Sequence, residues 1–279
     1  MDAVLPFSLP FAAPLPVIQC LAASEGAANN YYVGDWPDRR YDTVERAELH
    51  SFKVRAPKAQ ALVYAGGGYT KLMYDKEGVE VALWLNGLGI DAHILVHRLP
   101  GAPSGTGGVF QKDIALADGK SALKFLEATT GGLPLFHVGL SSGGHLAGVM
   151  ACQGSALDVR GALMAYAPLN ANHRMHKYPE GKPDYEPVRK QDFYDDWAIG
   201  LEGHGHGLPH CPLFLAYALQ DRTVPVQHAL NLLATASRHG VSVDAHIFGT
   251  APHGFALRDQ AGTHALWPQL ASDWFDRQL

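Results

Sequence analysis

The chain has 279 residues, of which 47% are hydrophobic and 18% charged, so it can bury a sizeable core and is not intrinsically disordered. A formal net charge of −5 excludes the basic footprint of a protein that binds nucleic acid or an anionic membrane. The cysteines Cys20, Cys152 and Cys211 lie far apart without a C-x-x-C spacing. The sequence therefore predicts neither a disulfide framework nor a zinc site, and favours a reducing, cytoplasmic compartment.

The N-terminal stretch from Met1 to about Ala23 is apolar, but it has no Lys or Arg and is broken by four prolines. A signal peptide needs a basic start and an unbroken apolar helix, and a membrane span needs about 18 uninterrupted apolar residues. We therefore expect residues 1–40 to form an extended arm on the surface of a single domain, residues 41–279, with no export signal and no membrane partner.

A loop of three glycines follows the first buried strand that the sequence predicts. Residues 42–54 alternate polar and apolar side chains like a strand, and residues 61–65 predict a buried strand that ends at Gly66-Gly67-Gly68. The loop lacks the G-x-G-x-x-G spacing and the Gly-Lys-Ser/Thr end of nucleotide-binding loops. Such a loop can instead supply backbone N–H groups to an oxyanion, because glycine lets the backbone approach a substrate closely.

Strands and helices alternate through the middle of the chain. Apolar patterns predict helices over residues 79–88 and 113–128, and strands over residues 90–99, 133–138 and 161–168. This alternation is typical of an α/β fold with a mostly parallel sheet and helices on both faces. The sequence shows no internal repeat and no linker that would divide the domain.

The G-x-S-x-G motif Gly139-Leu140-Ser141-Ser142-Gly143 lies between the strand at residues 133–138 and an apolar helix that starts near Leu146. In this strand–turn–helix context the motif predicts a sharp turn that presents Ser141 as a nucleophile. The two glycines suit such a turn, because the strand and helix backbones nearly touch there. The alternative is a glycine-rich turn in which Ser141 only caps the helix.

Residues 170–210 interrupt the alternation and are polar, which predicts a cap or lid insertion. Its aromatic side chains either form a stacking platform for a sugar or aromatic acyl group, or fix the cap to the body. These residues are Tyr178, Tyr185, Phe193, Tyr194 and Trp197. His204, His206 and His210 have no carboxylate or cysteine at regular helical spacing, so we expect a loop and no metal site.

Two further polar residues follow strands in the last third of the chain. Asp221 comes directly after a predicted strand at residues 212–219, and His253 lies in a glycine-bounded loop after a strand at residues 241–248. Chemistry in open α/β sheets gathers at the carboxyl ends of the strands, so both side chains should approach Ser141. The chain order Ser–Asp–His is that of α/β-hydrolase triads. The alternative for Asp221 is a helix or turn cap.

The run from about Ala61 to Leu279 also resembles a known family. The matching pieces are Gly66–Tyr69 with Glu77-Gly78, Ala82–Gly89, Arg98–Pro100, Gly139–Ala147, Asp221 with Val224-Pro225, and His253–Phe255. Together they resemble the acetylxylan-esterase-like branch of the α/β-hydrolase superfamily, which includes BD-FAE-type esterases. This resemblance implies an α/β-hydrolase fold and a serine carboxylesterase acting on short, acetyl-type esters, with a carbohydrate as one candidate alcohol.

The expected mechanism needs no metal and no organic cofactor. Ser141 would attack the carbonyl of a small-molecule ester, His253 would take and return the proton, and Asp221 would orient the imidazole. The N–H of Ser142 and an N–H of Gly67 or Gly68 would receive the oxyanion. Whether the protein forms a homo-oligomer stays open at this point.

Two alternative functions remain on the sequence alone. A prolyl-oligopeptidase-type aminopeptidase uses the same triad, although no acidic anchor for a peptide amino terminus can be identified in the cap. A catalytically silent hydrolase fold would bind a small ligand without turnover. The presence of all three triad residues speaks against a silent fold, since a binding module has no need of them.

Overall fold

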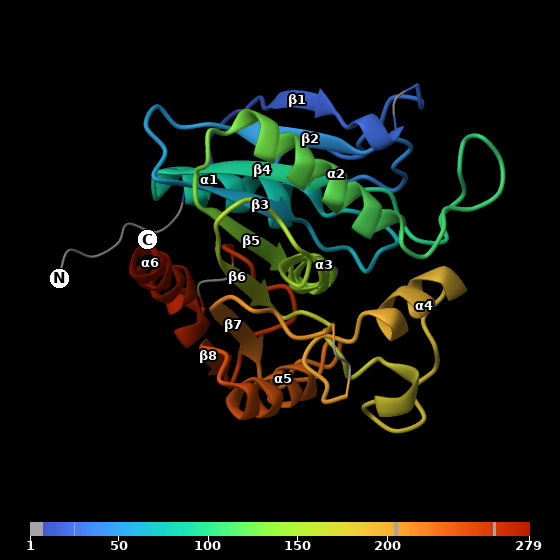
Figure 1. The fold of residues 1–279 in the computed structure, drawn as a ribbon, viewed down its shortest axis with the longest axis vertical. Helices are drawn as coiled ribbons and strands as arrows, with labels where there is room; N and C mark the ends of the chain where they lie inside the picture. The colour runs from blue at the N-terminus through green and yellow to red at the C-terminus, as the bar shows by residue number, and fades with distance from the viewer. Residues whose placement is uncertain (1–7, 25, 204–205, 259–260) are drawn as a thin grey trace.

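One mixed sheet runs through the computed structural model, which describes residues 8–24, 26–203, 206–258 and 261–279. Within the described residues the sheet has eight strands in the order β1-β2-β4-β3-β5-β6-β7-β8 (Figure 1). The pairs β1·β2 and β2·β4 are antiparallel, and the other neighbours are parallel. The strands are β1 Val17–Cys20, β2 Glu48–Phe52, β3 Ala59–Tyr64, β4 Ile90–Val96, β5 Leu135–Leu140, β6 Val159–Ala165, β7 Leu213–Ala218 and β8 Val243–Phe248.

Helices cover both faces of this sheet, as the alternating pattern predicted. The helices are α1 Glu80–Gly87, α2 Ile114–Thr129, α3 Ser142–Ala151, α4 Val188–Asp196, α5 Gln227–His239 and α6 Trp267–Gln278. Side chains of α1 and α6 belong to one hydrophobic cluster, and those of α2, α3 and α5 to a second cluster. Because both faces are covered, every residue of β3, β4, β5 and β7 is buried.

Aromatic side chains fix α6 and α1 to their face of the sheet. The ring centroids of Trp84 and Trp267 lie 5.3 Å apart, and those of Phe136 and Phe275 lie 4.8 Å apart, both edge to face. Each buried aromatic removes a large apolar area from water, which stabilises the docking of the C-terminal helix. Helix α6 at the C-terminus thus packs on the central strand β5, which also leads to Ser141.

The structure differs from the sequence prediction at two elements. Val17–Cys20, inside the expected arm, forms the edge strand β1, although most of its side chains are exposed and carry no alternating pattern. Helix α4 lies inside residues 170–210, where the polar composition gave no helical signal, because only a few of its residues are buried. Within the described residues, none of the helices combines the length and apolarity of a membrane span.

Candidate active site

Ser141 lies at the turn between β5 and α3 in a strained backbone conformation. Its φ is 53° and its ψ −128°, which a residue with a side chain adopts at a cost of about 1–3 kcal/mol. Two backbone hydrogen bonds hold the turn, from the Ser141 N–H to the Ala165 carbonyl (2.9 Å) and from the Gly144 N–H to the Ser141 carbonyl (2.9 Å). The turn places Ser141 directly after the carboxyl end of β5 and before the first residue of α3, which is the position that a nucleophile turn occupies.

The two glycines of the motif are required by backbone contacts. A Cβ on Gly139 would lie 2.1 Å from the Gly143 carbonyl oxygen, and a Cβ on Gly143 would lie 1.9 Å from the Tyr64 carbonyl oxygen. Both distances are far below any van der Waals contact, and the obstructing atoms belong to the backbone. The spacing of the motif therefore reflects the close approach of α3 to β5 and to the end of β3.

The structure brings Ser141, His253 and Asp221 together. The Ser141 Oγ lies 3.4 Å from the His253 Nε2, and the His253 Nδ1 lies 2.7 Å from the Asp221 Oδ2. The carboxylate of Asp221 is fully buried, and its Oδ1 accepts the backbone N–H groups of Thr223 (2.8 Å) and Val224 (2.9 Å). With Nδ1–H donating to this fixed carboxylate, Nε2 carries the lone pair that faces the serine hydroxyl.

The triple-glycine loop lies against the nucleophile turn. A Cβ on Gly66 would come within 2.8 Å of the Ser141 Cβ. The Gly68 N–H donates to the Ser142 Oγ (2.8 Å), so this predicted oxyanion donor instead fixes the loop to α3. Among the described residues nothing accepts the Gly67 N–H, and the Ser142 N–H at the start of α3 has no acceptor within its helix. Gly67 and Ser142 are therefore the two candidate donors.

Glu77, to which the sequence patterns assigned no role, is buried directly behind this loop. It lies in the π-helical turn η2, Asp75–Val79, and only 5% of it is exposed. Its Oε2 accepts the Gly66 N–H (3.0 Å) and its Oε1 accepts the Tyr166 hydroxyl (3.1 Å). Burial raises the pKa of the Glu77 carboxyl, while the neighbouring His253 and the Tyr166 hydroxyl act to lower it.

Tyr166 connects this carboxylate to the histidine. It follows β6, is fully buried and has a φ of 38°. Its ring packs edge to face on the imidazole of His253, with centroids 5.2 Å apart. Burial raises the pKa of its hydroxyl well above 10, so the phenol stays protonated and donates to Glu77. In the sequence, Tyr166 is a tyrosine at the end of a predicted strand. That signal can be recognised only once it is known that this strand, β6, lies beside β5, the strand that leads to Ser141.

The aromatic side chains of the cap mostly fix it to the body. Phe193 and Tyr194 are buried, and their rings contact Tyr69 (both 5.5 Å) and His145 (5.5 and 4.6 Å). Their faces are therefore covered, as expected of the anchoring alternative. His145, one turn into α3, donates its Nε2–H to the Trp197 carbonyl (2.7 Å), and its Nδ1 accepts the Tyr69 hydroxyl (3.0 Å). Burial lowers the pKa of His145 to about 4. Tyr178, in contrast, is 49% exposed.

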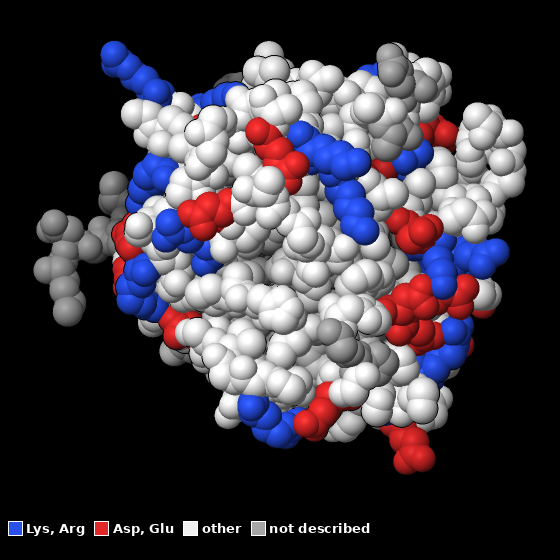
Figure 2. All heavy atoms as spheres, in the orientation of Figure 1, with Lys and Arg blue, Asp and Glu red and all other residues white. Residues whose placement is uncertain are grey.

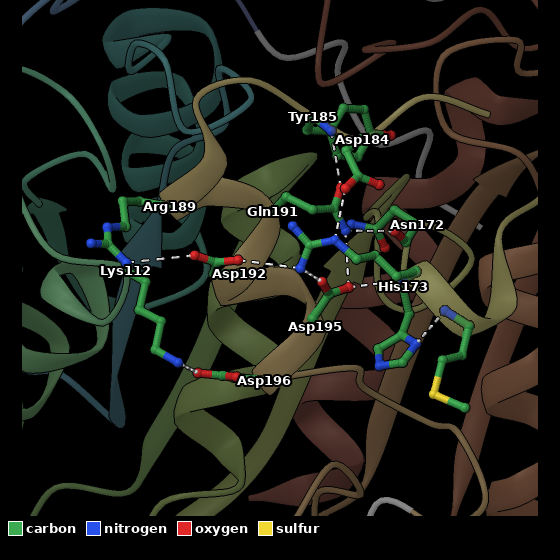
Figure 3. A network of polar contacts seen from close by, with 12 residues as sticks. Lys112, Asn172, His173, Asp184, Tyr185, Arg189, Gln191, Asp192, Asp195 and Asp196 are labelled. Carbon is green, nitrogen blue, oxygen red and sulfur yellow. Dashed lines mark hydrogen bonds and ion pairs between the residues drawn. The ribbon is translucent and has the colours of Figure 1, made fainter.

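Charged side chains organise the outer part of the cap. Arg174 forms ion pairs with Asp184 (2.7 Å), Asp192 (3.2 Å) and Asp195. Figure 3 labels these three aspartates. Lys112, which precedes α2, forms an ion pair with Asp196. Figure 2 shows these opposite charges gathered at the margin where α4 lies, while the middle of this face is largely uncharged.

The histidines of the cap do not assemble into a metal site within the described part of the chain. His206 contacts the Asp196 carbonyl oxygen (2.6 Å) and His210 is exposed, whereas His204 lies outside the described residues. Over the described ranges, no group of three or more His, Cys, Asp and Glu side chains has a geometry that could hold a metal ion.

Comparison with known proteins gives a family match and several structural relatives. Residues 133–279 match the model of the prolyl oligopeptidase family, and this half of the chain carries Ser141, Asp221 and His253. An acetylxylan esterase of Xylanibacter ruminicola is 24% identical over 82% of this chain and 48% of its own length. The chain thus spans about half the length of that curated relative.

Solved structures cover most of the chain at low sequence identity. An acetyl ester-xyloside bifunctional hydrolase from Caldicellulosiruptor lactoaceticus is 22% identical, with a TM-score of 0.63 over 83% of this chain and 88% of that one. An alpha/beta hydrolase enzyme from a Medee basin deep-sea metagenome is 20% identical, with a TM-score of 0.61 over 83% of this chain and 92% of that one. At such identities the likeness shows a shared fold.

Proposed function

This chain belongs to the prolyl oligopeptidase family and has the α/β-hydrolase fold, and on that premise we propose that it is a serine carboxylesterase for short-chain acyl esters. One observation carries the proposal: the hydrogen-bonded series from the Ser141 Oγ through His253 to the buried Asp221, at a strained turn beside a glycine loop. Acyl transfer needs a nucleophile, a base and an oriented carboxylate in this order.

In the first half of the reaction, the Ser141 Oγ attacks the ester carbonyl carbon while the His253 Nε2 removes the hydroxyl proton. The carbonyl oxygen becomes an oxyanion, which the N–H groups of Gly67 and Ser142 stabilise by about 3 kcal/mol each. Asp221 stabilises the imidazolium that has formed. Collapse of the tetrahedral intermediate breaks the ester C–O bond, and the imidazolium returns its proton to the leaving alcohol.

In the second half, water attacks the acyl-enzyme. His253 removes a proton from the water, the oxyanion forms again in the same place, and the acid leaves as Ser141 regains its proton. Both halves use the same five groups, since microscopic reversibility makes the leaving alcohol and the attacking water occupy equivalent positions. The cycle is complete with the side chains and backbone of this chain and needs no metal or organic cofactor.

For the substrate, we propose acetyl-type esters, with an acetylated carbohydrate as the leading natural candidate. The support is the likeness to an acetylxylan esterase over 82% of this chain. The family name favours a second candidate, an aminopeptidase, which needs a free carboxylate to anchor the amino terminus of a peptide. Four aspartates of the outer cap do not suit that task, because Asp184, Asp192 and Asp195 are paired with Arg174 and Asp196 with Lys112.

The test compares initial rates on p-nitrophenyl acetate, acetylated xylo-oligosaccharides and aminoacyl p-nitroanilides. We expect turnover of the acetyl esters and abolition of it by Ser141→Ala, with circular dichroism as the fold control. The matched control Ser242→Ala removes a hydroxyl from an exposed serine before β8 and should keep full activity. Ser141→Ala activity above a few per cent of the wild type would refute the assignment, and turnover of the anilides alone would favour the aminopeptidase.

A fluorophosphonate probe addresses the catalytically silent alternative. An activated serine forms a covalent adduct with loss of fluoride, which mass spectrometry detects as a mass increase on the peptide that contains Ser141. We expect this adduct in the wild type and its loss in Ser141→Ala. A wild-type chain that neither reacts nor turns over any ester would instead be a silent binder.

A further inference from the structure

A second carboxylate, besides Asp221, lies within electrostatic reach of His253. Glu77 comes from η2, the turn that follows the triple-glycine loop, and its carboxylate does not touch the imidazole directly. Two contacts connect the Glu77 carboxylate to the surroundings of the imidazole. The Tyr166 hydroxyl bonds to Oε1 while the ring of the same residue packs on His253, and a Cβ on Gly254 would lie 3.9 Å from Oε1.

The hydrogen bonds of Glu77 fit an ionised carboxylate. Both oxygens accept, one from the Gly66 N–H and the other from the Tyr166 hydroxyl. A protonated carboxyl would need an acceptor for its own proton; the amide N–H can only donate, and the Tyr166 hydroxyl could accept that proton only by giving up its own donation to Oε1. Burial opposes this charge and raises the pKa of Glu77, so His253, the Tyr166 hydroxyl, Lys76 and the Gly66 amide offset part of the cost.

The same carboxylate holds the loop that carries the candidate oxyanion donor Gly67. A Cβ on Gly66 would lie 2.2 Å from the Glu77 Oε2 and 2.8 Å from the Ser141 Cβ. Glu77, Gly66 and Ser141 therefore form a continuous row of contacts, with Gly67 next in the chain. A π-helical turn is rare in proteins and is frequent at functional sites, and here it directs Glu77 under the loop.

We propose that Glu77 and Tyr166 form a positioning pair that stabilises the imidazolium of His253 and fixes the position of the triple-glycine loop relative to it. This inference rests on the proposed esterase function. Neither residue gives or takes a proton in the reaction, and Tyr166 meets the base only through the packing of its ring on the imidazole. One buried carboxylate acts on two partners. It acts on the base, His253, through its charge and through the ring of Tyr166. It acts on the triple-glycine loop by accepting the Gly66 N–H.

The chemistry needs such a charge at the moment of attack. As the Ser141 proton moves to Nε2, the imidazole gains a full positive charge, and a fixed negative charge nearby lowers the energy of that state. Among the described residues, Asp221, Glu77 and Lys76 place charges near His253. The Lys76 Nζ lies 3.7 Å from the Cβ position of Gly254. The positive charge of Lys76 destabilises the imidazolium, so the negative charges of Asp221 and Glu77 have to outweigh this repulsion.

Glu77→Gln tests the negative charge of Glu77 separately from its hydrogen bond to the Gly66 N–H. The amide oxygen of Gln can still accept the Gly66 N–H, whereas the negative charge is gone. We expect kcat on p-nitrophenyl acetate to fall about tenfold with KM changed less than about twofold. The acidic limb of the kcat/KM profile should move about one unit to lower pH, because the imidazolium forms less readily without the charge.

Two further variants keep the test decisive if Glu77→Gln folds poorly. Tyr166→Phe retains the ring on His253 and removes the donor to Glu77, so the limb should move in the same direction by a smaller amount. Glu80→Gln is the matched control, because Glu80 is a buried carboxylate in the next turn that binds Arg258 and not the site. Its acidic limb should stay where the wild-type limb lies.

An NMR titration of the His253 imidazole in the Ser141→Ala background separates this inference from the proposed function, since it needs no turnover. We expect the midpoint of that titration to fall when Glu77→Gln is added. A fall without any esterase activity in the wild type would support the pair and refute the esterase. An active enzyme whose acidic limb and imidazole midpoint are unmoved in Glu77→Gln and Tyr166→Phe would overturn the pair.

Discussion

The nucleophile turn and the cap insertion are held together by different kinds of contact. At the turn, backbone atoms nearly touch, so a single methyl group on Gly143 would lie 1.9 Å from the Tyr64 carbonyl oxygen. In the outer cap, Arg174 bonds to three aspartates through side chains that water also reaches. The comparison teaches that the position of the nucleophile tolerates almost no change, whereas the exposed charged residues of the outer cap can be replaced at little cost in stability.

The sharpest test of the turn is the coupling between Ser141 and His253. Each single alanine variant should lower kcat/KM by about 10⁴-fold or more, because both residues serve one proton transfer. The double variant should be little worse than either single one. Initial rates on p-nitrophenyl acetate measure this, with circular dichroism as the fold control. Losses that multiply would mean that the two residues act in separate steps.

Gly143→Ala should break the turn itself. Because the new Cβ collides with backbone, α3 or β3 has to shift, and we expect at least about a hundredfold loss in kcat and about 3 kcal/mol less free energy of unfolding. Urea unfolding and initial rates measure the two effects. Gly154→Ala is the control, since a Cβ there meets nothing within 4 Å. Equal effects in both variants would contradict the steric argument.

Acid should weaken the sheet through its buried histidines. Burial lowers the pKa of His137 to about 3 and of His93 to about 4, from ordinary values near 6.5. These residues are neutral when folded but take up protons when unfolded below pH 6.5, so stability is full above pH 6.5 and falls as the pH drops towards 4. Between pH 6.5 and 5 we expect a loss of about 2 kcal/mol for each such histidine.

Urea unfolding at several pH values measures this loss. His137→Phe should flatten the dependence on pH, because it removes one site that protonates only on unfolding. His239→Gln, at the exposed end of α5, is the control and should leave the slope unchanged. A wild-type free energy of unfolding that is constant from pH 6.5 to 5 would contradict the prediction.

The dependence of the rate on acyl chain length tests whether the cap narrows the acyl pocket. We expect residues 170–210 to narrow the space beside Ser141, so that acetate or propionate esters exceed octanoate by at least about tenfold in kcat/KM. A long chain could gain about 0.8 kcal/mol per buried methylene if the space were open-ended. The measurement is a series of p-nitrophenyl esters from acetate to octanoate, and rates that climb along it would refute a closed pocket.

The smallest effect is expected in the charged network of the outer cap. Because Arg174 is 40% exposed, its ion pairs are screened, and Arg174→Ala should lower the Tm by less than about 3 °C, with the difference shrinking in high salt. Activity on p-nitrophenyl acetate should not change. Arg39→Ala is the contrasting variant, since it leaves the buried carboxylate of Asp75 unpaired and should cost far more.

The parts that the sequence predicted are those with local constraints. The strands of the parallel sheet and the glycines around Ser141 follow from apolar runs and from backbone contact, which a local pattern records. Glu77 and Tyr166 could not be found this way, because their meeting depends on the order of strands that are distant in the chain. Helix α4 was missed because it buries few apolar residues, and the engagement of Gly68 by Ser142 needs the actual loop geometry.

The strand order has a further consequence for where a ligand can bind. Chain connections leave β3 and β5, which are neighbours, in opposite directions: α1 follows β3 on one face, and α3 follows β5 on the other. In open doubly wound sheets such a reversal is the topological switch point, and ligands bind in the crevice outside the strand ends at this position. The triple-glycine loop and Ser141 flank this point. The connectivity of the strands alone therefore places the ligand site between the ends of β3 and β5, whatever side chains line it.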